Sequence, residues 1–272
     1  MNEWKDLLSL PNMLHFSESM QWTLIWITGL LLGLSLPLLI LEVIQLRKQG
    51  ALSKQRILGM LSNFSLFFPL VFFQSILAAS VYRLYLFFSG FQIWQVGVSW
   101  WSLLGCLMVI DFLYYWEHRI VHKVRALWEI FHSVHHSGEH FDQTVGTRIS
   151  FLDNLYTPFF YLPAIVIGFD LELVLVCMTL MLTYQQWIHT EWIQKIPGME
   201  GIFNTPSSHR VHHGRNGIYL DKNFGGILIL WDRLFGTYQP ETEKVEYGIL
   251  HPVKSINPLV VLFIGISRLS GK

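Results

Sequence analysis

The sequence predicts an all-α, polytopic integral membrane protein, a helical bundle with a histidine-rich di-metal site on its cytoplasmic side. Apolar residues make up 52% of the 272 residues and charged residues only 14%, against roughly 25% charged in an ordinary soluble domain. Ten of the twelve histidines fall between His118 and His213. Acidic and basic side chains are equal in number, 19 each, and no basic stripe indicates a nucleic-acid partner.

Four apolar regions are the candidate membrane elements. A hydrocarbon core of about 30 Å needs roughly 20 apolar residues in a helix. Residues 22–44, 57–81 and 96–115 each have about this length. The fourth region, 155–187, is too long for one crossing and contains Pro158, Pro163 and Gly168. Because such residues interrupt helices, we expect a helical hairpin that enters the membrane and returns. Residues 1–272 are expected to form one membrane domain.

The short loop between the first two spans indicates the orientation. It carries four basic residues between positions 47 and 56 and no acidic residue, and short basic loops stay in the cytoplasm. The third span then delivers His118 to the cytoplasmic side. The hairpin adds an even number of crossings, so His189 is expected on that same side.

Three histidine clusters and one single histidine predict a metal site. His118 and His122 are four residues apart, a spacing that places two helical side chains on one face. Two later clusters have the pattern His-x-x-His-His, whose members we also expect to share a face. The nine candidate ligands are His118, His122, His132, His135, His136, His189, His209, His212 and His213.

Imidazoles gathered near an apolar region cannot all be protonated, so we expect them to be neutral and to share a metal. One tetrahedral zinc takes four ligands, and nine therefore favour two metals with open positions. His140 could be a tenth ligand, a question that the sequence leaves open. His15 and His251 lie outside the clusters and are expected at the membrane interface.

Metal-bound imidazoles usually donate their second N–H to a carboxylate or a carbonyl. The candidate carboxylates are Asp111, Glu117, Glu139, Glu191 and Asp221. Asp111 is the most informative, because it lies two helical turns before His118 and an acid inside an apolar span is costly without a partner. A hydrogen bond that packs two helices is the alternative for this residue.

These motifs together resemble the fatty acid hydroxylase/sterol desaturase superfamily of membrane di-iron oxygenases, over residues from about 111 to 238. The segments Thr205-Pro-Ser-Ser-His-Arg-Val-His-His-Gly-Arg-Asn and Trp231-Asp-Arg-Leu-Phe-Gly-Thr are most similar to its alkylglycerol monooxygenase branch. The resemblance implies that the nine histidines hold two iron ions. It also implies an enzyme that uses O2 to hydroxylate or desaturate an unactivated C–H bond of a lipid. We favour hydroxylation, because this branch hydroxylates.

The resemblance also implies a lipid substrate from the bilayer and electrons from a separate donor or a small reductant. No flavin, haem or ferredoxin motif is visible in the sequence, and tetrahydrobiopterin, which the branch uses, is left open. No catalytic residue beyond the metal centre is expected. Candidate contacts for a polar or anionic head group are Arg148, Arg210, Arg215, Asn216 and Lys222. Each could equally be a capping or positive-inside charge.

Two rival functions would use the same histidines differently. A membrane metalloprotease needs His-Glu-x-x-His, whereas Glu117 here precedes the first histidine. A metal-binding or transport protein would place ligands through the depth of the bilayer. The three clusters instead gather on one predicted side, which favours the oxygenase.

Overall fold

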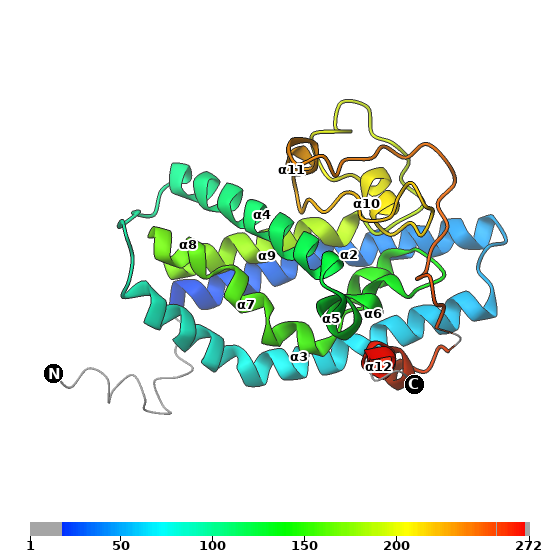
Figure 1. Cartoon of the computed structure of the whole chain (residues 1–272), viewed down its shortest axis with the longest axis horizontal. Coiled ribbons are helices and arrows are strands. Elements are labelled where there is room, and N and C mark those ends of the chain that lie inside the picture. The colour runs from blue at the N-terminus through cyan, green and yellow to red at the C-terminus, as the bar shows by residue number, and fades with distance from the viewer. Residues whose placement is uncertain (1–17, 254, 270–272) are drawn as a thin grey trace.

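Helices are the regular secondary structure of the described part of the chain. The structure, a computed structural model, describes residues 18–253 and 255–269, and within them β-pairing is limited to three isolated bridges. The long helices are α2 (Glu18–Lys48), α3 (Lys54–Ser89), α4 (Trp100–Lys123) and α9 (Leu171–Trp187) (Figure 1). The predicted all-α class is confirmed for these residues. His15 lies outside them.

Short elements join the long helices and carry five of the nine candidate ligands. They are α5 (Arg125–Leu127), the π-helix η2 (Trp128–His132), α6 (Ser133–His136), the 3-10 helices η3 (Gln143–Thr147) and η4 (Phe151–Leu155), α7 (Thr157–Phe160), α8 (Leu162–Ile167), α10 (Pro206–His212), α11 (Leu230–Leu234) and α12 (Pro258–Leu269).

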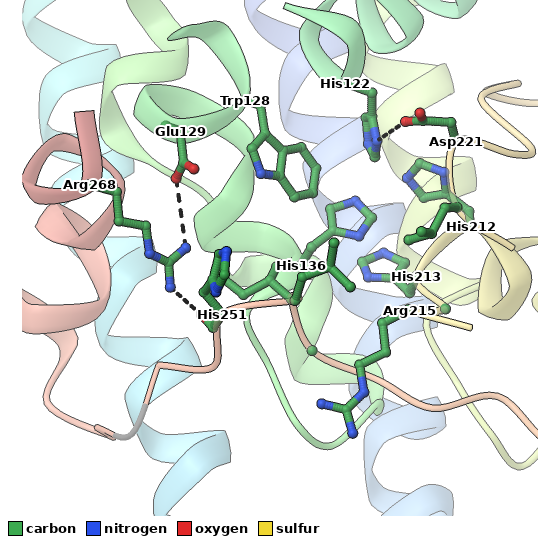
Figure 2. Close-up of a pocket in the computed structure, with 15 residues that line it drawn as sticks. His122, Trp128, Glu129, His136, His212, His213, Arg215, Asp221, His251 and Arg268 are labelled. Atoms are coloured by element: carbon green, nitrogen blue, oxygen red, sulfur yellow. Dashed lines mark hydrogen bonds and ion pairs between the residues drawn. The ribbon is translucent and has the colours of Figure 1, made fainter. Parts of the chain in front are cut away.

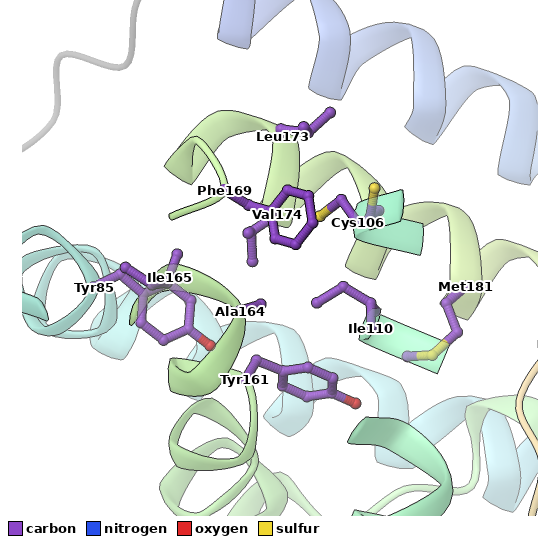
Figure 3. Packing of buried hydrophobic residues seen from close by; sticks show 11 residues of the cluster. Tyr85, Cys106, Ile110, Tyr161, Ala164, Ile165, Phe169, Leu173, Val174 and Met181 are labelled. Atoms are coloured by element: carbon purple, nitrogen blue, oxygen red, sulfur yellow. The ribbon is translucent and has the colours of Figure 1, made fainter. Parts of the chain in front are cut away.

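An apolar core fixes α4 and α9 against each other. Helix α9 packs between α2 and α4, and α3 contacts η4 and α8. Fully buried side chains from α3, α4, α8 and α9 meet in this core, among them Tyr85, Ile110, Ile165 and Met181 (Figure 3). Burial of such side chains is the main favourable term in folding. The core therefore positions the ends of the two helices from which histidines extend.

In the region of the predicted hairpin, a turn at Gly168 joins α8 to α9. This glycine has φ of +122°, and a Cβ there would lie 2.0 Å from the carbonyl oxygen of Trp94. Asp170 then starts α9 by accepting hydrogen bonds from the backbone N–H groups of Glu172 and Leu173, at 2.9 and 3.3 Å. The arms are short: α8 has 6 residues and α9 has 17, fewer than the roughly 20 of a full crossing.

The predicted spans map onto helices with one difference. Residues 22–44 lie in α2 and 57–81 in α3, but the third span is helical only from Trp100. Ser99 and Ser102 form a capping box that begins α4 at this point. By length and composition, α3 is the one helix among the described residues that could cross a membrane. The multi-pass topology and its orientation remain predictions.

The C-terminal helix α12 packs directly against the π-helix η2. A Cβ added to Gly265 would lie 1.6 Å from the carbonyl oxygen of Glu129, so the two backbones are in contact. Arg268 Nη1 lies 3.7 Å from Glu129 Oε2. Because η2 ends at His132, α12 supports the segment that carries a candidate ligand.

We predict that Gly265→Ala destabilises the protein by about 1–3 kcal/mol, because the new methyl group would separate α12 from η2. Thermal unfolding in detergent measures the effect. Gly59→Ala is the matched control, because an added Cβ there meets nothing within 4 Å. The control should gain about 0.5–1 kcal/mol from helix propensity. A Gly265→Ala protein as stable as wild type would contradict the close packing.

Candidate metal centre

The nine predicted ligands gather into two groups. The first contains His118, His122, His132, His136 and His212, and the second contains His135, His189, His209 and His213. Within each group the ligand atoms all lie within 4.8 Å of one another. His140 is exposed and, like His251, belongs to neither group. The structure thus brings together segments separated by almost a hundred residues.

Each His-x-x-His-His cluster is divided between the two groups. His132 and His136 face the first group, whereas His135 faces the second. In the later cluster the middle histidine, His212, belongs to the first group, and the outer two belong to the second. Residues four apart in a helix share a face, and their neighbours point elsewhere. The expectation that all three members share one face is therefore wrong, because only the outer two do.

Short and irregular elements orient the side chains of the candidate ligands. The π-helix η2 leads directly into α6, so His132 and the pair His135-His136 come from one continuous segment. Such π segments often occur at functional sites. Helix α10 begins after Thr205, whose side chain accepts a hydrogen bond from the backbone N–H of Ser208. His189 follows the end of α9.

Backbone carbonyls orient four of the imidazoles. In each case Nδ1 lies 2.8–3.2 Å from a carbonyl oxygen. A carbonyl only accepts hydrogen bonds, so Nδ1 carries the proton and Nε2 keeps a free lone pair. The pairs are His118 with Phe224, His135 with Arg148, His189 with Gln185, and His212 with Lys222.

Two of these lone pairs face each other. The Nε2 atoms of His135 and His189 are 3.3 Å apart, yet neither has a proton to donate because both Nδ1 atoms are protonated. His209 Nε2 lies 2.9 Å from His189 Nε2. A bound zinc has nitrogen ligands at about 2.0–2.1 Å in a tetrahedral arrangement, so two ligand atoms are roughly 3.3 Å apart. A shared cation fits this spacing and removes the repulsion.

Further buried nitrogens in the two groups have no hydrogen-bond partner. They are Nε2 of His122, His136, His212 and His213, and Nδ1 of His209. Unpaired buried polar atoms are rare in native proteins. Their concentration here, on neutral imidazoles, is the arrangement that a metal completes.

Burial keeps the imidazoles neutral. It lowers the pKa of His189 and of His212 to about 4. In the other seven histidines, burial and the neighbouring imidazoles lower the pKa well below 6.5. Neutral imidazole is the metal-binding form, so both groups are competent ligands at pH 7.

Asp111 does not bond to a histidine, contrary to the first of its two predicted roles. Its carboxylate accepts the backbone N–H groups of Ile227 and Leu228 and the indole N–H of Trp231, at 2.6, 3.1 and 2.8 Å. The nearby loop thus engages both carboxylate oxygens. Asp111 therefore ties α4 to the segment that follows Phe224.

Asp232 completes this attachment and was not identified from the sequence. It accepts hydrogen bonds from the backbone N–H groups of Phe224 and Gly225, at 2.8 and 2.7 Å. The Phe224 carbonyl is thereby held where it meets His118. The motif Trp231-Asp-Arg was visible in the sequence, but its role depends on a backbone contact.

Among the other predicted carboxylates, only Asp221 reaches a histidine, with Oδ1 3.9 Å from His122 Nδ1. Glu117 instead accepts hydrogen bonds from Thr157 and Tyr161, at 2.8 and 2.6 Å. Glu139 and Glu191 are exposed. These three predictions are wrong, because carbonyls occupy the positions expected for carboxylates.

Two of the predicted head-group contacts are structural. Arg148 is buried and bonds to Val134, Ser137 and Asn63. Arg210 is also buried and bonds to Glu241, Thr190 and Ile193. All three nitrogens of each guanidinium group therefore donate hydrogen bonds within the protein. They organise the loops around the site and are not available to a lipid.

The remaining three predicted contacts lie on the segment after α10. Asn216 bonds to Glu243 and to the Lys244 carbonyl. Lys222 supplies its carbonyl to His212. Arg215 alone lines the pocket that opens onto the histidines.

This pocket, of about 300 Å³, gives access to the metal centre (Figure 2). Its inner wall includes His122, His136, His212 and His213. Its outer wall includes Trp128, Glu129, Arg215, Asp221, His251 and Arg268. The ring of Trp128 contacts that of His122, with centroids 4.7 Å apart. A small polar molecule could therefore approach the first group from this side.

Comparison with known proteins agrees with this site. Residues 103–237 match the model of the family described as fatty acid hydroxylase, a range that includes every histidine of both groups. The chain carries a fatty acid hydroxylase domain. The resemblance predicted from the histidine motifs is thereby confirmed.

Curated relatives share this domain. The chain is 39% identical to alkylglycerol monooxygenase of Homo sapiens over 196 residues. This match covers 72% of this chain and 43% of the relative. It is 43% identical over 169 residues to alkylglycerol monooxygenase of Xenopus tropicalis, 62% of this chain and 36% of the relative. Ornithine lipid hydroxylase OlsE of Rhizobium tropici is 28% identical over 146 residues, 53% of this chain and 44% of the relative. The chain thus spans less than half the length of these relatives. No solved structure matches.

The lowered pKa of His189 predicts how stability depends on pH in the metal-free protein. The unfolded chain binds a proton at this histidine below about pH 6.5, but the folded chain does so only below about pH 4. The contribution of His189 to the free energy of unfolding should therefore fall by about 3 kcal/mol between pH 6.5 and 4. Below pH 4 this contribution should stay level. Chemical unfolding of chelator-treated wild type and His189→Gln measures the difference. A difference that does not change with pH would contradict a buried neutral His189.

Proposed function

We propose that the chain is an integral membrane di-iron oxygenase that hydroxylates an unactivated C–H bond of a lipid, using O2 and external electrons. The observation that carries the proposal is the pair of facing Nε2 lone pairs on His135 and His189, 3.3 Å apart. Both belong to the second of two adjoining imidazole groups in a fatty acid hydroxylase domain. Relatives named as lipid hydroxylases and monooxygenases support the lipid and the reaction. Desaturation by the same site is the second candidate.

The donor set suits iron without selecting it. Imidazole ligands bind zinc, copper, iron and nickel, so the choice of iron rests on the family. An unactivated C–H bond gives acids, bases and nucleophiles nothing to attack, and bound iron supplies the oxidising chemistry. The chain's own residues hold the centre: carbonyls orient the imidazoles, and burial keeps these neutral and excludes bulk water.

The depth of the site supports a membrane location. From Trp100 to His118 helix α4 rises by about 27 Å, close to the hydrocarbon thickness of about 30 Å. At the far end Trp94, Trp100 and Trp101 are 62%, 81% and 82% exposed, and tryptophan is enriched at membrane interfaces. The histidines would then lie at the opposite interface. The basic loop between α2 and α3 supports the cytoplasmic side for that interface.

The apolar surface of the bundle and the pocket with charged walls would serve different molecules. Exposed apolar side chains such as Phe68 and Phe72 on α3 and Leu182 on α9 offer lipid contact along the bundle. The pocket beside Arg215 and Arg268 has charged walls. We therefore place lipid entry on the bundle side and the approach of a separate electron donor or small reductant at the pocket.

Metal analysis tests the centre. We expect two irons per chain in protein purified with iron available. His122→Ala, in the first group, and His209→Ala, in the second, should each reduce this content to about one or less, because each removes a ligand. His140→Ala is the matched control, since His140 is exposed and outside both groups, and should keep both ions. Unchanged metal in His209→Ala would contradict the second group.

Isotope labelling tests the reaction. Iron-loaded protein with 1-O-hexadecylglycerol, a chemical reductant and 18O2 should yield a product that carries one 18O atom, detected by mass spectrometry. His209→Ala should yield none. Loss of two hydrogen atoms without incorporated oxygen would indicate desaturation. Metal bound without any lipid product would favour the metal-binding or transport alternative.

A further inference from the structure

Helix α12 is apolar on two opposite faces. Its inner face, which includes Val261 and Leu262, is buried against α3, η2 and α6. Its outer face consists of exposed apolar residues, namely Leu259, Val260, Phe263, Ile266 and Leu269. A helix that is apolar all round is either buried in protein or lies in a membrane. The outer face of α12 therefore needs an apolar partner of its own.

The direction of α12 differs from that of the bundle. Figure 1 shows α12 end-on, whereas α2, α3, α4 and α9 run across the same view. The helix therefore lies crosswise to the long helices. Its 12 residues rise by about 18 Å, less than a hydrocarbon core of about 30 Å. If the long helices cross a membrane, α12 runs along the membrane plane.

Two long helices give the same depth for α12. On α3, α12 shares a buried cluster with Leu66, and from Leu66 to the helix end at Ser89 the rise is about 35 Å. On the other side, α12 packs on η2, which follows the end of α4 at Lys123. From Trp100 to Lys123 the rise is again about 35 Å. Both values slightly exceed the hydrocarbon thickness of about 30 Å, so α12 lies at the interface on the histidine side.

The surroundings of the outer face favour lipid over a second protein. Phe67 and Phe68 on α3 directly follow Leu66 and are exposed, so the apolar surface of the bundle continues onto α12. The charged residue of α12, Arg268, turns toward the protein, where it meets Glu129 and the carbonyl of His251. The outer face thus lacks the polar rim that is typical of a protein interface.

We propose that α12 is an in-plane membrane helix whose outer face is embedded in the bilayer interface on the histidine side. Helices of this kind bury their apolar face about 5–10 Å into the boundary between head groups and acyl chains. Because α12 packs directly on η2, the bilayer then supports the segment that ends at His132. The inference rests on the membrane location in the proposed function and is independent of the oxygenase chemistry.

Spin labels measure the depth of α12 in lipid. Leu259→Cys and Phe263→Cys each receive a nitroxide label in protein reconstituted into phosphatidylcholine nanodiscs. Electron paramagnetic resonance then compares label collisions with O2, which concentrates in lipid, and with a water-soluble nickel chelate. The native Cys106 and Cys177 are buried, so the wild type should take up little label and gives the background.

Both α12 labels should collide more often with O2 than with the chelate, at a depth of about 5–10 Å below the lipid phosphates. Phe72→Cys is the hydrocarbon reference, because Phe72 is exposed on α3. It lies six residues beyond Leu66, so its label should be about 9 Å deeper. Gly217→Cys is the aqueous control, since Gly217 is exposed and an added Cβ there meets nothing within 4 Å. It should prefer the chelate.

Three results would overturn the inference. Frequent chelate collisions at the α12 labels would place the outer face in water, and few collisions with either reagent would mean that protein covers it. A depth equal to that of Phe72→Cys would place α12 inside the hydrocarbon core. Leu259→Cys, at a 65% exposed position, serves if Phe263→Cys does not fold. Frequent chelate collisions at Phe72→Cys would instead refute the membrane location in the proposed function.

Discussion

The metal centre depends on four backbone carbonyls. Because a carbonyl only accepts, each one fixes the proton on an imidazole Nδ1 and turns the Nε2 lone pair inward. A single backbone atom orients each of these rings, so any movement of a loop would redirect a ligand. Much of the buried polar network outside the centre holds those loops. Asp111 and Asp232 hold the segment around Phe224 by hydrogen bonds. The side chain of Arg148 likewise holds the segment whose Arg148 carbonyl orients His135.

Long helices and irregular segments have different roles in this fold. The apolar core fixes α4 and α9, which present His118 and His189 at their ends. The π-helix η2 and the short helices α6 and α10 then bring five further histidines to the same place. Helix α12 packs over the π-helix, and its backbone contact at Gly265 leaves no room for a side chain. Packing of this kind resists the displacement that would misplace His132.

Sequence patterns predicted the gathering of the histidines better than their surroundings. Eight histidines in three helically spaced clusters are evident in the sequence, and Pro158, Pro163 and Gly168 indicated a break in the last apolar region, because these signals are local. The division of each cluster between two groups follows from the same helical spacing, although it was not foreseen. The carbonyl partners could not be predicted, since every residue has a carbonyl. Arg148 and Arg210 were predicted as lipid contacts. Their structural role follows from burial, which is a property of the tertiary fold and is not visible in the sequence.

The exchange of histidines between the groups sets the geometry of the whole centre. His135 and His136 face different groups, as do His212 and His213, and consecutive Cα atoms are 3.8 Å apart across a trans peptide. Two peptide units therefore act as covalent spacers between the groups, and they limit how far the two groups can move apart. Inserting one residue into either cluster would rotate the following histidines by about 100° and exchange their partners. Length variation should be confined to the connections outside the clusters.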